Sequence, residues 1–472
     1  MKCTVVLAIL LAPFAALRAA DAPGQKPNII FVLFDDMGYG QPKCYRAGTE
    51  FKTPNFDRLA KEGMRFTDAH SAASVCTPTR YGVMTGRYPS RIGQYGVLTT
   101  YSPPIIPKTR LTVASMLQQN GYDTVCIGKW HLGMEWGDTP KNEKNIPVGT
   151  RLLTSPNAAG FDTFYGYTHA RNIGTVIEQD KVEANVEEVE AQPRLAKKAV
   201  AFLDHPARKD KPFFLYLPLC PPHTPIVPAP EFAGKSGING KEGHYGDWVY
   251  QGDWVLGQVL DALGRNKLAD NTLIMVSSDN GAAGRPYAPL RGAKASIYEG
   301  GHREPFLARW PGKIKAGAVC DDIICLNDLM ATCAEIVGAK LPDNAGEDSV
   351  SILPDLLGTA KGPVREAIIH QDPKGNLALR QGPWKLIFFK DGKRELYNLQ
   401  NDMSETKDLA AANPDVVKRL TALMNRYISE GRSTVGAPQK NEADMSVDKA
   451  NSGGGGKRKG KKGKKNSKEE TT

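Results

Sequence analysis

The run NIIFVLF, residues Asn28–Phe34, decides the fold class of this chain. Every residue after Asn28 is apolar, so the alternation that marks a strand with one solvent-facing side is absent. A continuous apolar run is typical of a strand buried on both faces, as in a parallel sheet covered by helices. Two carboxylates, Asp35 and Asp36, follow the run directly. Because α/β sheets place their sites at the carboxyl ends of strands, we expect both acids to lie in a functional site.

Three further runs repeat this pattern, and we expect strands at Asp123–Gly128, Pro212–Leu219 and Thr272–Ser278. The last of them ends at Asp279-Asn280, so oxygen donors again follow a buried strand. Capped amphipathic patterns predict helices between the strands, at Thr53–Gly63, Thr109–Asn120, Arg194–Leu203 and Tyr245–Leu263. Together these patterns predict an α/β fold with a large, mostly parallel central sheet flanked by helices.

The run CTPTRYGVMTGR, residues Cys76–Arg87, opens a short helix in this interpretation. Thr77 is a suitable N-cap and Gly86 a natural stop. Cys76 then lies just ahead of the helix, where free N–H groups and the positive end of the dipole favour an anion. Arg80, one turn on, can lean back toward the same point. The run therefore combines a candidate nucleophile with a cation and an anion-binding helix end.

Other candidate groups follow the later strands. Lys129 and His131 come after the second strand and project to the same side if the segment is extended. His223 stands between prolines in a stiff loop, and Lys294 follows an Arg-Gly pair. A single lysine or histidine of this kind is more often an exposed residue without a catalytic role. The functional interpretation therefore depends on the whole set of residues.

As a set they resemble the type I sulfatases, the formylglycine-dependent members of the alkaline phosphatase superfamily. The matching elements occur in family order between Pro27 and Leu399. They are Cys76-x-Pro78-x-Arg80, Thr85-Gly86-Arg87, Lys129-x-His131-Leu132-Gly133, Arg291-Gly292-x-Lys294 and Glu299-Gly300-Gly301-x-Arg303-x-Pro305. His302 occupies a variable position of the last element, and no catalytic role is expected for it.

The resemblance implies a modified cysteine and one metal ion. Cys76 would be oxidised by a formylglycine-generating enzyme to formylglycine (3-oxoalanine), whose hydrate is the nucleophile. One divalent cation would be bound close to residue 76 by Asp35, Asp36, Asp279 and Asn280. Hard oxygen donors without a neighbouring His or Cys ligand favour Ca²⁺ over zinc, with Mg²⁺ second.

The resemblance also implies a role for each remaining group. The hydrate transfers one oxygen to sulfur and uses the other to expel sulfate, so the aldehyde is regenerated. His131 would take the proton that drives this release. His223 and Lys294 would bind sulfate oxygens and help protonate the leaving alcohol. Arg80 and Lys129 would hold the hydrate and offset developing charge.

The chain divides into four predicted regions: a signal peptide at 1–20, a catalytic domain at 26–345, a C-terminal subdomain at 346–432 and a disordered basic tail at 433–472. Short alternating runs in Leu377–Leu399 and a closing helix at Pro414–Glu430 predict that the subdomain is α+β with an antiparallel sheet. The stretch 137–190 shows little periodicity and predicts loops and short elements over the site that select the substrate.

Charge and cysteine content bear on the compartment and the partners. The formal net charge of the 472 residues is +10, and much of the excess lies in Lys457–Lys468. The body has no basic stripe, so nucleic-acid binding is not expected, although the tail could contact a polyanion. After the leader, no run is apolar enough for a transmembrane anchor, and the protein is expected to be exported, either secreted or periplasmic. Its disulfide pairing stays open, although Cys126 and Cys220 read as buried thiols.

These observations predict an arylsulfatase-like sulfuric ester hydrolase acting on a sulfated carbohydrate or an aryl sulfate. The alternative is a formylglycine-dependent phosphonate or phosphodiester hydrolase of the same superfold. A phosphatase with two zinc ions is disfavoured because few histidines accompany the acids. A non-enzymatic polyanion-binding protein would leave the acids, lysines and histidines of the motifs without a purpose.

Overall fold

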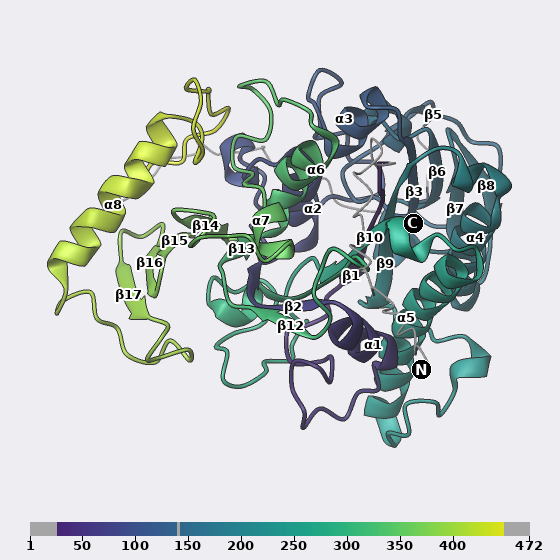
Figure 1. Ribbon diagram of the computed structural model, residues 1–472, viewed down its shortest axis with the longest axis horizontal. Helices are drawn as coiled ribbons and strands as arrows, with labels where there is room; N and C mark the ends of the chain where they lie inside the picture. The colour runs from purple at the N-terminus through teal and green to yellow at the C-terminus, as the bar shows by residue number, and fades with distance from the viewer. Residues whose placement is uncertain (1–25, 139–141, 448–472) are drawn as a thin grey trace, which may run out of the picture.

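The computed structural model describes residues 26–138 and 142–447. The predicted leader at 1–20 and the lysine-rich run Lys457–Lys468 lie outside these residues. A large sheet between helices forms the main body, and a smaller sheet with helix α8 lies at one side of it (Figure 1).

The large sheet has the strand order β12-β2-β11-β10-β1-β9-β3-β6-β7-β8, and β13 also pairs with β2. Strand β1 (Asn28–Asp35) lies between β10 (Thr272–Ser278) and β9 (Phe213–Pro222) and runs parallel to both. β9 is parallel to β3 (Asp123–Lys129), which is parallel to β6 (Thr163–Tyr167). The prediction of a large, mostly parallel central sheet is therefore confirmed.

Antiparallel strands extend the sheet on both sides of this parallel centre. The remaining strands of the sheet are β2 (Met64–His70), β7 (Thr175–Glu178), β8 (Lys181–Asn185), β11 (Arg303–Arg309), β12 (Ala318–Cys320) and β13 (Ile324–Cys325). A separate two-stranded sheet pairs β4 (Glu135–Trp136) with β5 (Leu152–Thr154).

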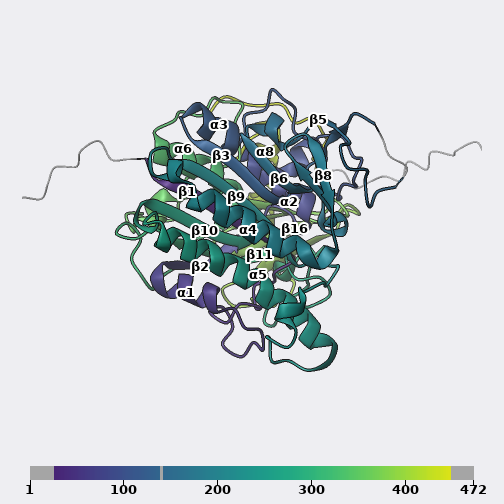
Figure 2. The ribbon, with the colours of Figure 1, turned by 90° about the vertical axis from the view of Figure 1, so that its right-hand side faces the viewer.

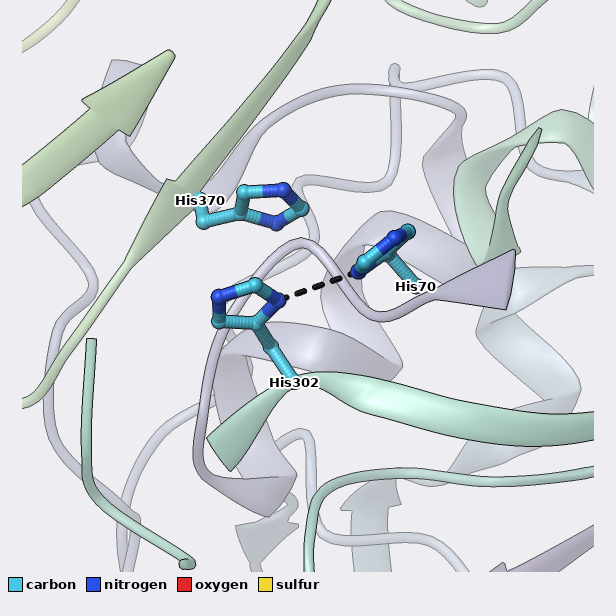
Figure 3. A group of neighbouring side chains, drawn as sticks. All are labelled: His70, His302 and His370. Atoms are coloured by element: carbon cyan, nitrogen blue, oxygen red, sulfur yellow. Dashed lines mark hydrogen bonds between the residues drawn. The ribbon is translucent and has the colours of Figure 1, made fainter. Parts of the chain in front are cut away.

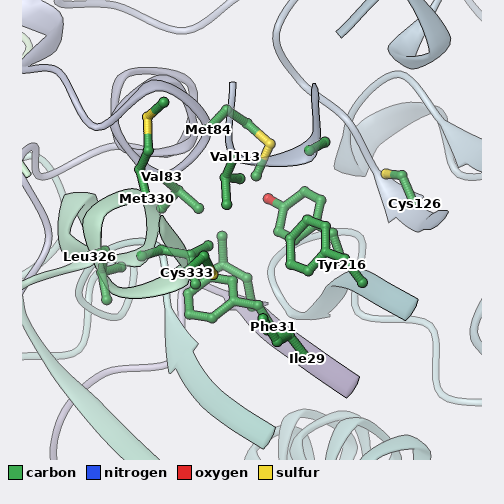
Figure 4. Packing of buried hydrophobic residues seen from close by; sticks show 14 of the residues in the cluster. Ile29, Phe31, Val83, Met84, Val113, Cys126, Tyr216, Leu326, Met330 and Cys333 are labelled. Atoms are coloured by element: carbon green, nitrogen blue, oxygen red, sulfur yellow. The ribbon is translucent and has the colours of Figure 1, made fainter. Parts of the chain in front are cut away.

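The apolar residues of β1 point alternately to the two faces of the sheet, and each face is covered by its own helices (Figure 2). Ile29 and Phe31 pack with α2 (Cys76–Thr85), α3 (Val113–Gln119) and α6 (Leu329–Val337), as Figure 4 shows for part of this cluster. On the other face β1 packs with α1 (Pro54–Glu62), α4 (Ala191–Asp204) and α5 (Gly240–Arg265).

The smaller sheet is antiparallel throughout, as predicted. It consists of β14 (Ile368–Gln371), β15 (Leu377–Gln381), β16 (Trp384–Phe388) and β17 (Arg394–Asn398), followed by α8 (Pro414–Ser429). The short helix α7 (Leu353–Leu356) precedes it. Gln371 at the end of β14 forms a parallel bridge with Ala73, so the small sheet is joined to the segment that leads into α2.

Two predictions about irregular segments are wrong in part. The stretch 137–190 contains β6, β7 and β8, which complete the large sheet; their short runs carry too weak a period to be recognised. The chain also stays packed beyond Ser433, because Met445 and Val447 are buried against the C-terminal subdomain. The predicted tail therefore begins no earlier than residue 448.

Smaller corrections concern helix ends and cysteines. Helix α3 begins at Val113 rather than near Thr109, because Thr112 forms the capping box with Ser115. Cys126 and Cys220 are buried free thiols, as expected. No helix in the described ranges is long and apolar enough to cross a membrane.

Candidate functional site

The carboxyl ends of β1 and β10 form the floor of the site. Phe34 and Ser278 are paired in the parallel register of these strands, so the residues that follow them meet. The backbone N–H of Asp36 donates to Oδ1 of Asp279 at 3.1 Å. Asp35, Asp36, Asp279 and Asn280 are all buried. The sheet thus brings together the four oxygen-bearing residues that the sequence predicted, from positions far apart in the chain.

Helix α2 delivers the candidate nucleophile to this floor. The helix begins at Cys76, and Gly86 ends it in the left-handed conformation, with φ of 64°. Thr77 is not the N-cap, because its hydroxyl donates to the carbonyl of His131 at 3.1 Å and accepts from the N–H of Leu98. The sulfur of Cys76 and carboxylate oxygens of Asp35 and Asp279 all lie within 4.8 Å of one another.

Three cations pair with the three carboxylates. Arg80 donates from Nη2 to Asp279 Oδ2 at 2.7 Å, and Lys129 Nζ lies 2.6 Å from Asp35 Oδ2. Lys294 donates to Asp36 Oδ1 at 2.5 Å. Two of the cations, Arg80 and Lys129, are completely buried with their partners. These two ion pairs are therefore shielded from solvent, and each carboxylate has a positive charge beside it.

Burial and charge act in opposite directions on these acids. Burial raises the pKa of Asp35, but Lys129, His223 and Arg80 outweigh it, so the pKa lies well below the ordinary value. For Asp279, burial and then the neighbouring Asp35 charge raise the pKa to about 7. A cation bound beside Asp279 would favour the ionised form of this carboxylate.

The donor set fits a hard divalent cation. Asp35 Oδ1 and Asn280 Oδ1 are buried oxygens without a hydrogen-bond partner in the described part of the chain. Buried polar atoms are normally satisfied, and these two lie among three carboxylates. Oxygen atoms predominate in the set, which suits Ca²⁺ or Mg²⁺ better than zinc.

His131 lies at the wall of the site, and one of its ring nitrogens is already hydrogen-bonded. Its Nε2 lies 3.0 Å from the carbonyl of Leu98 and must donate to it, which leaves Nδ1 as the lone-pair nitrogen. Burial, and then Lys129, hold the pKa of His131 well below its ordinary value, so the ring is neutral. The predicted extended segment is wrong, because His131 has φ of 57°. The turn still leaves His131 beside the same cavity as Lys129.

His223 approaches from the end of β9. Its Nε2 lies 3.9 Å from Asp36 Oδ2, and its Nδ1 contacts the carbonyl of Thr224. Burial lowers the pKa of His223, although Asp35 and Asp36 oppose this effect. The ring therefore faces the acids and lines the cavity above them.

A cavity of about 720 Å³ opens above the floor. Every predicted catalytic residue except Arg80 lines it; Arg80 lies beneath, paired with Asp279. Further wall residues were missed from the sequence, and they are Gly96–Thr100, Glu143, Lys144, His169–Asn172 and Pro373. His169 and Arg171 follow β6, so recognising that strand would have pointed to them.

A parallel sheet with buried acids, lysines and histidines at the carboxyl ends of its strands defines a hydrolase of the alkaline phosphatase fold. The sulfatase family matches residues 27–339, and the C-terminal family of N-sulphoglucosamine sulphohydrolase matches residues 293–432. The chain therefore belongs to the sulfatase family, and it is a sulfuric ester hydrolase.

Individual relatives agree with this assignment. An N-acetylgalactosamine-6-O-sulfatase of Bacteroides thetaiotaomicron is 32% identical, with 85% of this chain and 93% of the relative covered. Human arylsulfatase A is 34% identical, with 86% and 89% covered. A solved structure from work on glycosaminoglycan metabolism by Bacteroides thetaiotaomicron superposes with a TM-score of 0.77 at 29% identity, covering 85% of this chain and 99% of that one.

Proposed function

We propose that this chain removes sulfate from a sulfated carbohydrate, using formylglycine made from Cys76. The observation that carries the proposal is the position of Cys76. It stands at the start of α2, within 4.8 Å of the acids Asp35 and Asp279, and lines a cavity shared with Lys129 and Lys294. A group placed there can reach an anion held by Lys294 and His223, which line the same cavity.

A sugar substrate suits the shape and polarity of the cavity. Its volume of about 720 Å³ exceeds what a sulfate group needs, and its outer wall carries the polar side chains Glu143, Lys144 and Arg171. Convergent polar groups at the rim of a pocket orient a hydroxyl-rich ligand. The relative named as an N-acetylgalactosamine-6-O-sulfatase supports the same substrate class.

Residue 76 in its oxidised, hydrated form supplies two hydroxyl groups, one to attack sulfur and one to drive sulfate release. His131 would act as the base, and its contact with Leu98 supports this role because Nε2–H donates there and the lone pair is left on Nδ1. His223 and Lys294 lie on the cavity side of Asp36, where they can bind sulfate oxygens and protonate the leaving alcohol.

Arg80 and Lys129 have a different task, since both are buried and already paired. Their positive charge lies under residue 76 and offsets the negative charge that grows there during attack. Asp35, Asp36, Asp279 and Asn280 would hold one Ca²⁺, with Mg²⁺ second, close to residue 76. Such a cation would neutralise and orient the sulfate group.

We further propose that the protein is exported and is matured by a formylglycine-generating enzyme. The run Lys457–Lys468 would then meet sulfated polymers outside the cell and concentrate the enzyme on them.

The decisive experiment compares a sulfate ester with phosphorus esters of the same aryl alcohol. Purified protein is assayed with an aryl sulfate and with the matching aryl phosphonate and phosphodiester, and then with defined sulfated mono- and disaccharides. We expect sulfate release to dominate and one sulfated sugar to exceed the aryl sulfate in kcat/KM. Faster cleavage of the phosphonate or phosphodiester, in a protein whose Cys76→Ala variant is inactive, would transfer the chain to the alternative class.

A further inference from the structure

Three histidines meet at the junction of the two sheets, away from the cavity (Figure 3). His70 ends β2, His302 precedes β11, and His370 belongs to β14 of the small sheet. All three are completely buried. His70 Nδ1 lies 3.1 Å from His302 Nδ1, and the rings of His302 and His370 are stacked with centroids 3.8 Å apart and an angle of 14°.

This histidine cluster does not have the geometry of a metal site. The lone pair of an imidazole nitrogen lies in the plane of its ring, so the nearly parallel rings of His302 and His370 cannot direct lone pairs at one ion. Cations also stand beside the rings. Lys385 Nζ lies 3.0 Å from His302 Nε2, and Arg380 Nη1 lies 3.2 Å from His70 Nε2. A divalent ion there would be repelled by both.

The contacts instead favour one arrangement of the protons on His70 and His302. Asp68 Oδ1 is 2.6 Å from His70 Nε2, and an ionised carboxylate can only accept, so His70 carries its proton on Nε2. Its Nδ1 must then accept from Nδ1–H of His302. This leaves His302 Nε2 to accept from Lys385, which can only donate. Two contacts do not fit this arrangement as hydrogen bonds: the carbonyl of Ile297 lies 3.1 Å from His302 Nε2 and Arg380 Nη1 lies 3.2 Å from His70 Nε2. The contacts still run without a break from Lys385 through His302 and His70 to Asp68.

Burial, and not the neighbouring acids, favours the neutral form of the three imidazoles. Burial is the largest influence on all three rings and holds each pKa below its ordinary value. Another buried acid, Glu304, lies in the strand next to His70 and also contacts Ser71. The other surrounding ions pair with one another as Arg303–Asp68, Arg380–Asp68, Lys385–Glu299 and Lys385–Glu405.

The cluster is bonded to the segment that ends at the nucleophile. Ser71 donates its N–H to the carbonyl of His302 at 2.8 Å, and its own carbonyl accepts from Nδ1–H of His370 at 3.2 Å. The segment Ser71–Val75 then pairs with Gln371, the neighbour of His370, before α2 begins at Cys76. The segment Ser71–Val75 is therefore hydrogen-bonded both to the large sheet, through His302, and to the small sheet, through His370 and Gln371.

We propose that the histidine cluster is a positioning device for residue 76. The contacts from Lys385 through His302 and His70 to Asp68 dock the small sheet on the large one, and His370 then fixes the carbonyl of Ser71. This role rests on the proposed function, since it assumes that residue 76 is the reacting group. None of the three histidines touches the substrate cavity, so they act through the backbone.

Two substitutions of His370 separate positioning from stability. His370→Phe keeps a flat ring over His302 but cannot donate to Ser71. His370→Asn loses the ring but keeps an N–H donor near the Nδ1 position. We expect kcat for an aryl sulfate to fall about tenfold or more in the Phe variant with KM within about twofold, because misplacement of a reacting group costs rate rather than substrate binding. The Asn variant should retain kcat within about threefold, even at a lower Tm.

Formylglycine content is measured by mass spectrometry in each variant, and kcat is given per modified chain. The exposed His205→Gln is the control for a histidine outside the cluster. Equal kcat in both His370 variants, with only Tm changed, would overturn the proposal, as would a stoichiometric metal in the wild type that is lost in His302→Gln. Should the Phe variant not fold, His302→Gln decides by the same criterion on kcat and KM. A wild type without sulfatase activity would instead count against the proposed function.

Discussion

Lys129 Nζ lies 2.6 Å from Asp35 Oδ2, and both side chains are completely buried. The two residues end β3 and β1, which are separated by β9 in the sheet. Lys129 therefore reaches across the end of a strand to an acid that lies well before it in the sequence. This pair places an ammonium group beside the candidate metal site and near the candidate nucleophile. Its charge lowers the pKa of Asp35, which burial alone would raise.

The metal site can be tested by removing one carboxylate at a time. Asp35→Asn and Asp279→Asn should each abolish calcium binding and lower kcat by about 10³-fold, because the cation contributes several kcal/mol of charge stabilisation. Elemental analysis should find one calcium per wild-type chain and none in the variants. Asp261→Asn, at an exposed acid paired with Arg58, is the control. Two stoichiometric zinc ions in the wild type would contradict this prediction.

Modification of Cys76 is tested on the purified chain. Mass spectrometry of the peptide that carries residue 76 should show the aldehyde or its hydrate, and Cys76→Ala should lower turnover by about 10³-fold or more with Tm unchanged. The side chain is small and lies at a cavity wall, so its loss leaves the core intact. Full activity in a sample that contains only the unmodified thiol would show that another group attacks sulfur.

Asp253 should make stability depend on pH. It is buried on α5 and accepts from the backbone N–H groups of Asn55 and Phe56 at the start of α1. Burial raises its pKa to about 7, so the folded state holds the proton more tightly than the unfolded state. The resulting stability is complete below the unfolded pKa near 4 and is lost as the pH rises toward 7.

The size of this effect is about 1–4 kcal/mol in the free energy of unfolding, and Asp253→Asn should remove it. Urea unfolding of both proteins between about pH 4 and pH 8 measures the difference. The curves should converge at acid pH and separate toward neutral pH, with the variant more stable there. Parallel curves over the whole range would show that Asp253 is ionised throughout.

Two truncations separate the packed end of the chain from the basic run. A chain ending at Glu430 loses the burial of Met445 and Val447 and the Arg87–Glu442 pair, so its free energy of unfolding should fall by about 2–5 kcal/mol. A chain ending at Val447 should keep both Tm and aryl sulfate turnover.

On a sulfated polymer at low salt, the chain ending at Val447 should show a higher apparent KM than the full chain. The difference should vanish at high salt, because charges are screened beyond about 10 Å at 0.1 M. If the two proteins had identical KM values for the polymer at low salt, the basic run would have no role in substrate binding.

Local signals in the sequence were enough for the large sheet and the floor of the site. The apolar run ending at Asp35 and the run ending at Asp279-Asn280 each specify a buried strand followed by oxygen donors. Parallel strands bring such ends together whatever lies between them. The wall residues His169 and Arg171 were missed because β6 is short and lacks a clear period. The capping role of Thr77 was wrong because a distant carbonyl, that of His131, takes its hydroxyl.

The sequence by itself determined the family, the strands of the sheet centre and the residues around the nucleophile, since these depend on period and spacing along the chain. Only the tertiary structure decided the strand order, the pairing of Lys129 with Asp35 and the meeting of His70, His302 and His370. Those contacts join residues from strands far apart in sequence, and their protonation follows from burial and neighbouring charge. For the three histidines, burial and neighbouring charge arise only when the small sheet docks on the large one.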